Sequence, residues 1–291
     1  MSYIEIAILA IVQGAAELLP VSSSAHVIVA ERLMGHDPSR PELTFLLVML
    51  HTGTMGAVLC YFWRRWHERF RQRVHSGSNA WHLPAMVVLA TAVTVILGFA
   101  LKALIERAFL ADAGASPDSE IEALFKNLPL IAASLGAVGV FMIVSGCRRP
   151  TAPVERITPP TALLIGLVQG LCLPFRGFSR SGATISAGLC RGLSRRLAED
   201  FSFALVVLLT PGVILWELRR LVKHGDLASG SGLREPLVQG LVGMVLSFVA
   251  GLLALRVLSA VLERGGWKYF GYYCVVAAGA VWAVDHFGIH F

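Results

Sequence analysis

A carboxylate, three consecutive serines and a histidine lie close together between two apolar runs near the start of the sequence. The stretch QGAAELLPVSSSAH contains Gln13, Glu17, Ser22, Ser23 and His26. A carboxylate can take up a proton, a serine hydroxyl can attack phosphorus, and a histidine can exchange protons near neutral pH. Gln13 and Glu17 are four residues apart and are therefore predicted on one helix face. These residue types are those of a hydrolytic site.

The same stretch also has a purely structural interpretation. Pro20 ends one helix, and a serine after it can cap the next helix. Glu17 would then be buried in an ion pair with an arginine. One capping serine is enough for that purpose, however, and a cap does not explain why Glu17 and His26 share one tip.

A second stretch, FRGFSRSGAT, has the residues expected of a phosphate site. Its glycines let backbone N–H groups turn toward an anion, and Arg180 offers a planar, permanently charged fork. A helix that starts near Ser181 would add the positive end of its dipole. The alternative is a capped helix whose Arg180 pairs with an acid such as Glu17. The candidate residues of this stretch are Arg176, Gly177, Ser179, Arg180, Ser181, Gly182 and Thr184.

If the two stretches meet, Glu17 lies near an anionic phosphate, and their repulsion must be relieved. A divalent cation that bridges carboxylate and phosphate oxygens is one solution. Glu17 acting as a base toward a serine or a water is another. His51, within a predicted membrane span, is a supporting candidate. The combination predicts a phosphate-ester or pyrophosphate hydrolase site inside a membrane.

The composition indicates an integral membrane protein. The 291 residues are 55% hydrophobic and only 15% charged, with a mean hydropathy of +0.67, whereas a soluble domain is about one quarter charged. The net charge of +6 comes from basic residues clustered in short loops, which is typical of topology signals. No nucleic-acid partner is indicated, and the five scattered cysteines have no metal-ligand spacing.

Eight apolar segments divide into two kinds. Two of them, 3–35 and 160–193, are broken near the middle by proline, glycine and serine and are predicted to be re-entrant helical hairpins. The other six are long enough to cross the hydrocarbon core. These predicted transmembrane helices are 44–62, 84–105, 128–147, 200–222, 236–262 and 267–287. The fold class is therefore an all-α integral membrane protein.

The two broken segments resemble each other, which predicts an internal repeat. Both read apolar-apolar-Gln-Gly, then Leu-Pro, then a serine-bearing turn, with Gln13 and Gln169 156 positions apart. Each hairpin precedes three spans, and an odd number inverts the second half relative to the first. The prediction is one membrane domain over 1–291, with repeats of about 1–147 and 157–289.

Loop charges give the expected orientation. The loops 63–75 and 147–156 are arginine-rich and are predicted to be cytoplasmic, whereas 106–126 is acidic and is predicted outside. The first hairpin then enters from outside and the second from the cytoplasm, so that their tips meet near the midplane. The loop 219–235 weakens this assignment, because it carries four basic residues and yet is assigned outside.

These motifs resemble those of the undecaprenyl-diphosphate phosphatases, the bacitracin-resistance membrane family. The family pattern (Glu/Gln)-x-x-x-Glu, then Pro-Val-Ser-Ser and a nearby His, is matched from Gln13 to His26. The pattern Pro-Gly-x-Ser-Arg-Ser-x-x-Thr is matched from Gly177 to Thr184, except that Arg176 stands where the family usually has proline. The resemblance covers essentially the whole chain.

The resemblance implies a hydrolase that acts on a phosphoric anhydride. The reaction would convert undecaprenyl diphosphate to undecaprenyl phosphate and inorganic phosphate, recycling the lipid carrier of peptidoglycan synthesis and conferring bacitracin resistance. It also implies the bacterial inner membrane, a site that opens to the periplasm, and a divalent cation, Mg²⁺ or Ca²⁺. The functional positions carried over are Glu17, Ser23, His26, Ser179, Arg180 and Thr184.

Several alternatives stay open at this stage. The nucleophile is expected to be Ser23, with a water activated by Glu17 as the alternative. Gln13 leaves Glu17 as the one carboxylate of its tip, so a metal site that needs two protein carboxylates is not expected. The rival function is a polyprenyl-phosphate lipid transporter or flippase, because broken helices in inverted repeats are typical of transporters. The expected partners are the polyprenyl diphosphate substrate and membrane lipid, with a homodimer left open.

Overall fold

The computed structural model describes most of the chain as helices. The described residues are 1–36, 41–77, 79–110, 127–148, 152–175, 177–223 and 234–286. Within these ranges the helices are α1 (Tyr3–Leu18), α2 (Ser23–Leu33), α3 (Pro41–His75), α4 (His82–Leu110), α6 (Leu128–Cys147), α7 (Pro159–Cys172), α8 (Arg180–Cys190), α9 (Arg195–Lys223), α10 (Arg234–Glu263) and α11 (Trp267–His286). In these ranges the β-structure consists of one isolated bridge, so the prediction of an all-α protein is confirmed.

Five of the predicted spans coincide with helices that are long and apolar enough to cross a membrane. These are segments of α3, α4, α6, α9 and α10 within the described residues. The sixth predicted span corresponds to α11, a helix of 20 residues. Its lysine, its tyrosines and its tryptophans lower its hydropathy relative to the other five, although it packs along α6 over most of its length.

The surface of α10 shows how the bundle meets lipid. Large apolar side chains are exposed at every fourth position along this helix: Leu237, Leu241, Val245, Val249, Leu253 and Val257. Twenty helical residues span about 30 Å, which is the thickness of the hydrocarbon core. A continuous exposed apolar stripe of this length would promote aggregation of a soluble protein. The chain is a multi-pass membrane protein.

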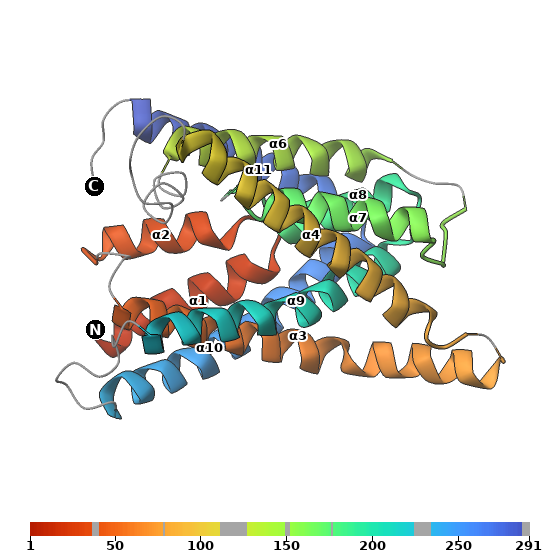
Figure 1. Cartoon of the computed structure of the whole chain (residues 1–291), viewed down its shortest axis with the longest axis horizontal. Coiled ribbons are helices and arrows are strands. Elements are labelled where there is room, and N and C mark those ends of the chain that lie inside the picture. Colours follow the sequence, from red (N-terminus) through yellow and green to blue (C-terminus); the bar gives the residue numbers. More distant parts are fainter. Residues whose placement is uncertain are drawn as a thin grey trace.

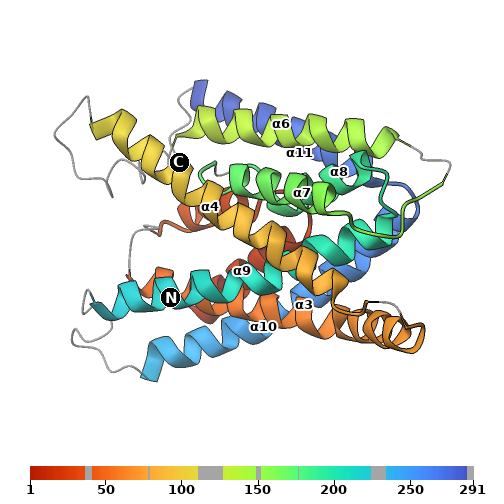
Figure 2. The ribbon, with the colours of Figure 1, turned by 45° about the vertical axis from the view of Figure 1, so that its right-hand side comes forward.

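The short helices form two pairs that approach the centre of the bundle from opposite ends (Figure 1). From the end that holds the N-terminus, α1 runs inward and α2 returns to the same end. From the other end, α7 runs inward and α8 returns. Figure 2 shows α4 crossing in front of α9, with α7 beside α4 toward α6, and with α3 and α10 on the side of the bundle opposite α6 and α11. The two inner turns with the adjoining helix ends are called tip 1, residues 17–26, and tip 2, residues 173–175 and 177–184.

Small residues hold both pairs against the long helices. A Cβ atom on Gly14 of α1 would lie 2.7 Å from the carbonyl oxygen of Ser247 on α10. A Cβ atom on Gly166 of α7 would lie 2.4 Å from the carbonyl oxygen of Ala90 on α4. Both distances are far below van der Waals contact, so only glycine permits these helix crossings. The depth of each tip in the bundle is therefore fixed by backbone contact.

A buried charge network ties α3 to α9 on the side of the bundle where α3 ends. Arg65 lies 2.9 Å from Glu199, and Arg69 lies 3.1 Å from Asp200. Both carboxylates are nearly inaccessible, and Ser259 of α10 also donates a hydrogen bond to Glu199. Carboxylates buried in this way are stable only when they are paired, so the network fixes the relative position of three helices.

Candidate active site

Tip 1 is a tight, strained turn between α1 and α2. The chain leaves the helix at Leu19, which has an extended backbone conformation, and Pro20 prevents the helix from continuing. Ser22 has φ = 69°, a left-handed conformation that is unfavourable for a serine. This turn starts α2 at Ser23, and it places the Ser23 hydroxyl beside the last turn of α1.

Tip 2 is shaped by a glycine and a helix cap. Gly177 has φ = 97°, and a Cβ atom there would lie 2.5 Å from the carbonyl oxygen of Ile131. Ser179 then caps α8, because its Oγ accepts a hydrogen bond from the backbone N–H of Gly182 at 3.3 Å. The helix begins at Arg180, one residue before the predicted start. Arg180 thus lies at the positive end of the α8 dipole.

The two tips meet at Glu17. Its Oε1 lies 2.9 Å from Arg180 Nη2, and its Oε2 accepts a hydrogen bond from Ser23 Oγ at 2.5 Å. Gln13 Nε2 lies 3.3 Å from Oε2, and His51 Nε2 lies 3.7 Å from the same oxygen. The prediction that the two tips contact each other is therefore confirmed, across 163 positions of sequence.

The contact at Glu17 also matches the purely structural interpretation of the two stretches. Helix α8 is capped by Ser179, and Arg180 pairs with Glu17, as that interpretation predicts. The pair is not fully buried, since 24% of the Arg180 side chain and 13% of the Glu17 side chain are exposed. A permanently buried structural ion pair would have no such access. Both side chains of the pair are therefore partly accessible from outside the protein.

His26 joins tip 1 to α11. Its Nδ1 lies 2.8 Å from the carbonyl oxygen of Ser22, and its Nε2 lies 2.5 Å from the hydroxyl of Tyr273. A carbonyl oxygen only accepts, so Nδ1 carries the proton of the neutral ring and Nε2 accepts from Tyr273. The two rings are also stacked, with centroids 5.8 Å apart. Sequence analysis had placed His26 on tip 1 but had not identified this partner.

The hydroxyls of tip 2 are mostly engaged within the protein. Thr184 is 1% exposed, and its Oγ1 donates to the carbonyl oxygen of Arg180 at 2.9 Å and lies 2.6 Å from Ser202 Oγ. Ser181 Oγ lies 3.5 Å from Ser179 Oγ, and both serines are 5% exposed. Thr184 therefore supports the first turn of α8, whereas the two serines lie next to Arg180.

The remaining candidate residues, apart from Arg176, support the site from neighbouring positions. A Cβ atom on Gly182 would lie 3.0 Å from Met142 Sδ, so this glycine allows α8 to approach α6. Ser22 contributes its backbone carbonyl to His26, and His51 also holds Nδ1 against the carbonyl of Leu47 at 2.8 Å. The predicted role of Arg176 lies outside the described residues.

The atoms around Glu17 indicate how the site could hold the predicted divalent cation. Among the described residues, no three His, Cys, Asp or Glu side chains are grouped closely enough to hold a metal ion. Glu17 is the single carboxylate at the meeting point of the tips, and its oxygens face Arg180 and Ser23. Magnesium is commonly held by one or two carboxylates together with substrate phosphates. The residues present fit an ion only when substrate oxygens complete its coordination.

Tyr273 is a polar partner of the site that the sequence did not predict, as is Ser202, which contacts Thr184. Tyr273 lies in the run YFGYYC, and nothing in the spacing of that run distinguishes it from Tyr269 or Tyr272. The structure does distinguish it, because α11 packs beside α6 and turns only this tyrosine toward tip 1. The sequence offered a single indication of this contact, namely a tyrosine within a predicted span at the depth of the broken helices.

Comparison with known proteins agrees with this geometry. Residues 6–280 match the family described as bacitracin resistance protein BacA. Undecaprenyl-diphosphatase 2 of Acinetobacter baylyi is 52% identical over 97% of both chains. Undecaprenyl-diphosphatase 2 of Burkholderia lata is 34% identical over 97% of this chain and 96% of the relative. Undecaprenyl-diphosphatase of Porphyromonas gingivalis is 30% identical over 96% of this chain and 95% of the relative. With a match from α1 to α11 that includes both tips, the chain belongs to the bacitracin resistance protein BacA family.

Proposed function

We propose that this protein hydrolyses undecaprenyl diphosphate to undecaprenyl phosphate and inorganic phosphate. The observation that carries the proposal is the arrangement at Glu17: one carboxylate oxygen is 2.5 Å from a serine hydroxyl and the other is 2.9 Å from an arginine. A base, a nucleophile and an anion-binding cation thus share a single point. The names of the relatives describe the same activity.

Substrate recognition follows from the second tip. The guanidinium of Arg180 matches two oxygens of a phosphate, and the start of α8 adds a partial positive charge. Ser179 and Ser181 lie beside it as further donors. Binding of the diphosphate would compete with Glu17 for Arg180, so substrate would loosen the ion pair and free Glu17 to act as a base.

The chemistry can be written with these side chains alone. Ser23 Oγ attacks the terminal phosphorus while Glu17 takes the hydroxyl proton, and the bond from that phosphorus to the bridging oxygen breaks. Undecaprenyl phosphate leaves, and a phosphoserine remains. Glu17 passes its proton to the departing undecaprenyl phosphate and becomes a carboxylate again. Water then attacks the phosphoserine and gives a proton to Glu17, the bond from phosphorus to Ser23 Oγ breaks, and Glu17 returns that proton to Ser23 as inorganic phosphate leaves. In the alternative, Glu17 activates a water that attacks the substrate directly.

His26 and Tyr273 form a second proton-exchanging pair at the same tip. The hydrogen bonds at both ring nitrogens hold the imidazole of His26 in one orientation. Nε2 can receive a proton from Tyr273 or pass one along the same contact. The pair is suited to moving protons between tip 1 and the outside of the bundle during the hydrolytic step.

A divalent cation is part of the proposal, held by Glu17 together with oxygens of the diphosphate. Such an ion would neutralise negative charge that develops on the leaving phosphate. The support for it is the composition of the site: an anionic substrate must approach a carboxylate whose one close, permanently charged partner is Arg180.

We further propose that α1–α2 and α7–α8 are re-entrant hairpins in two inverted repeats, with six transmembrane helices in the bacterial inner membrane and a site open to the periplasm. The order of elements supports this, since two short helices precede three long ones in each half. The contacts are also paired: α1 packs on α10 as α7 packs on α4, and α6 packs on α11. A two-fold relation between the halves would produce this pattern.

The decisive experiment is phosphate release by an Arg180→Ala variant in detergent. Loss of the charged clamp should reduce turnover of a polyprenyl diphosphate by about 10²- to 10³-fold. The control is Arg64→Ala, because Arg64 is an exposed arginine of α3 whose side chain is 88% accessible. Near-normal turnover in the Arg180 variant would overturn the assignment. Reconstituted vesicles distinguish the hydrolase from the rival transporter. Lipid translocation without release of free phosphate would indicate a transporter.

A further inference from the structure

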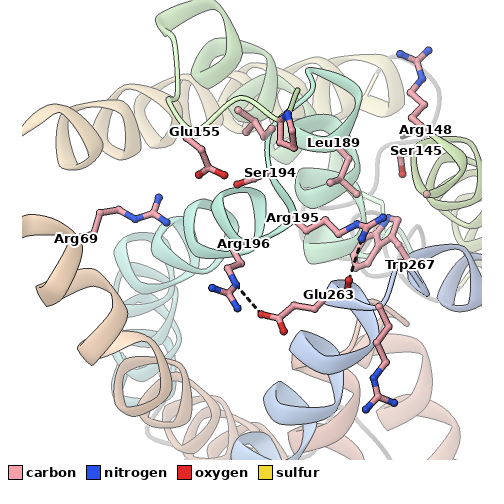
Figure 3. A pocket seen from close by; sticks show the side chains of 15 residues that line it. Arg69, Ser145, Arg148, Glu155, Leu189, Ser194, Arg195, Arg196, Glu263 and Trp267 are labelled. Atoms are coloured by element: carbon pink, nitrogen blue, oxygen red, sulfur yellow. Dashed lines mark hydrogen bonds and ion pairs between the residues drawn. The ribbon is translucent and has the colours of Figure 1, made fainter. Parts of the chain in front are cut away.

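A basic cavity of about 900 Å³ lies at the end of the bundle from which α7 and α8 enter. Figure 3 shows the side chains that line it. Its walls come from the end of α6, the segment before α7, the α8–α9 turn and the α10–α11 turn. Five arginines and two glutamates line it, which leaves an excess of three positive charges. This cavity is called the basic pocket.

Two of these arginines are neutralised by acids. Arg69 lies 3.1 Å from Asp200, which is buried within the bundle. Arg196 lies 2.8 Å from Glu263, and Figure 3 shows this pair at the edge of the basic pocket. Both arginines therefore have a structural role, and neither one needs an external anion.

The other three arginines have no such partner. In the described ranges, no carboxylate lies within ion-pair distance of Arg148, Arg195 or Arg264. Arg195 Nη1 donates to the backbone carbonyl of Glu263 at 3.0 Å, which fixes the guanidinium without neutralising it. Once Asp200 is counted against Arg69 and Glu155 is counted among the lining residues, the pocket keeps an excess of two positive charges, which attracts an anion.

The rest of the lining suits the head of an amphiphile. Ser194 caps the start of α9, where free backbone N–H groups add to the positive potential. Leu189, Leu193 and Trp267 give the pocket an apolar wall. The Trp267 side chain is rigid, because it is 1% exposed and its Nε1 donates to Ser186 Oγ at 3.0 Å.

The basic pocket is separate from the site at Glu17. Helix α8 connects the two, with Arg180 at one end and Leu189 at the other. Nine residues of helix correspond to about 14 Å. A phosphate group held by Arg180 therefore cannot also contact the arginines of the basic pocket, and binding there does not depend on the proposed hydrolysis.

We propose that the basic pocket binds a phosphate group at the surface of the membrane, brought either by the head group of an anionic phospholipid or by free inorganic phosphate. Basic pockets between membrane helices, at the level of the head groups, recognise such lipids. The arginine-rich end of α3 lies at the same end of the bundle, but its exposed residues Arg64 and Arg71 do not line the pocket.

The experiment compares two double variants of the full chain in detergent. Arg148→Gln/Arg264→Gln removes two uncompensated charges from the pocket. Arg64→Gln/Arg71→Gln removes two charges from exposed positions of α3 that do not line the pocket. Native mass spectrometry counts bound phosphatidylglycerol, with zwitterionic phosphatidylcholine as the reference lipid. Calorimetry with sodium phosphate, in an Arg180→Ala background, measures the free ion.

The pocket variant should weaken binding by about fivefold for each arginine removed, while the α3 variant changes it little. Selective loss of phosphatidylglycerol identifies a lipid head group. Selective loss of the phosphate ion identifies inorganic phosphate. Equal binding of both ligands by the pocket variant and the unaltered chain would refute the proposal, as would an equal loss in the α3 variant. Size-exclusion profiles confirm that each variant is folded.

Discussion

The contact between Ser23 and Glu17 leads to a quantitative prediction. The oxygens are 2.5 Å apart, the separation expected for a hydroxyl that donates to an ionised carboxylate. Glu17→Gln keeps the size of the side chain but removes the base, and Ser23→Ala removes the nucleophile. General-base catalysis contributes about 10²- to 10⁴-fold, so each single variant should lose turnover within that range.

The double variant tests whether the two residues act as one unit. If their effects were independent, two losses of about 10³-fold would multiply to about 10⁶-fold. Because the serine attacks only while the carboxylate takes its proton, losing one partner already removes the shared step. The double variant should therefore be no more than about threefold slower than the slower single variant, as for other catalytic units.

The assay is single-turnover release of inorganic phosphate from a polyprenyl diphosphate in detergent. Ser134→Ala, a buried serine of α6, is the matched control and should keep its rate within about twofold. Multiplicative losses would refute the coupled unit. Retention of most activity by Ser23→Ala alone would show that Glu17 activates a water instead.

Three further predictions concern positioning and stability. Tyr273→Phe should lower kcat by about two- to tenfold with KM unchanged, because one hydrogen bond to the tip 1 histidine is lost. Gly53→Ala should lower the Tm in detergent, since its Cβ would meet a backbone carbonyl of α10, whereas Gly212→Ala, with open space around it, should not. Arg65→Leu should lower the Tm because it removes the arginine partner of the buried Glu199 carboxylate, whereas Arg64→Leu, at an exposed pair, should leave the Tm unchanged.

The architecture was largely predictable because the membrane imposes a simple rule. Apolar runs longer than about 18 residues must be helices that cross it, and a run broken by proline and serine must be covered by protein. Five predicted spans coincide with α3, α4, α6, α9 and α10. The meeting of the two tips was predictable for a related reason, since Glu17 and Arg180 are costly in a membrane unless each finds a partner.

The contacts that depend on how the long helices pack were not predictable. Nothing local to His26 indicates Tyr273, which lies 247 positions later on a helix with several tyrosines. Likewise, the pairing of Arg65 with Glu199 across 134 positions depends on the way α3 crosses α9. The basic pocket has the same origin, because its arginines come from separate turns that only the fold brings together.

Gln13 offers a test of the cation part of the proposal. Its Nε2 lies 3.3 Å from Glu17 Oε2, so Gln13→Glu would place a second carboxylate beside the first. Without an ion, the two negative charges would repel each other and would share Arg180, so the Tm in detergent should fall. With Mg²⁺ or Ca²⁺, two carboxylates should bind at a concentration at least about tenfold lower than one, because added ligand charge tightens binding. Ion-dependent thermal shifts of the variant and the unaltered chain measure this without turnover. Identical shifts would place any bound ion away from Glu17.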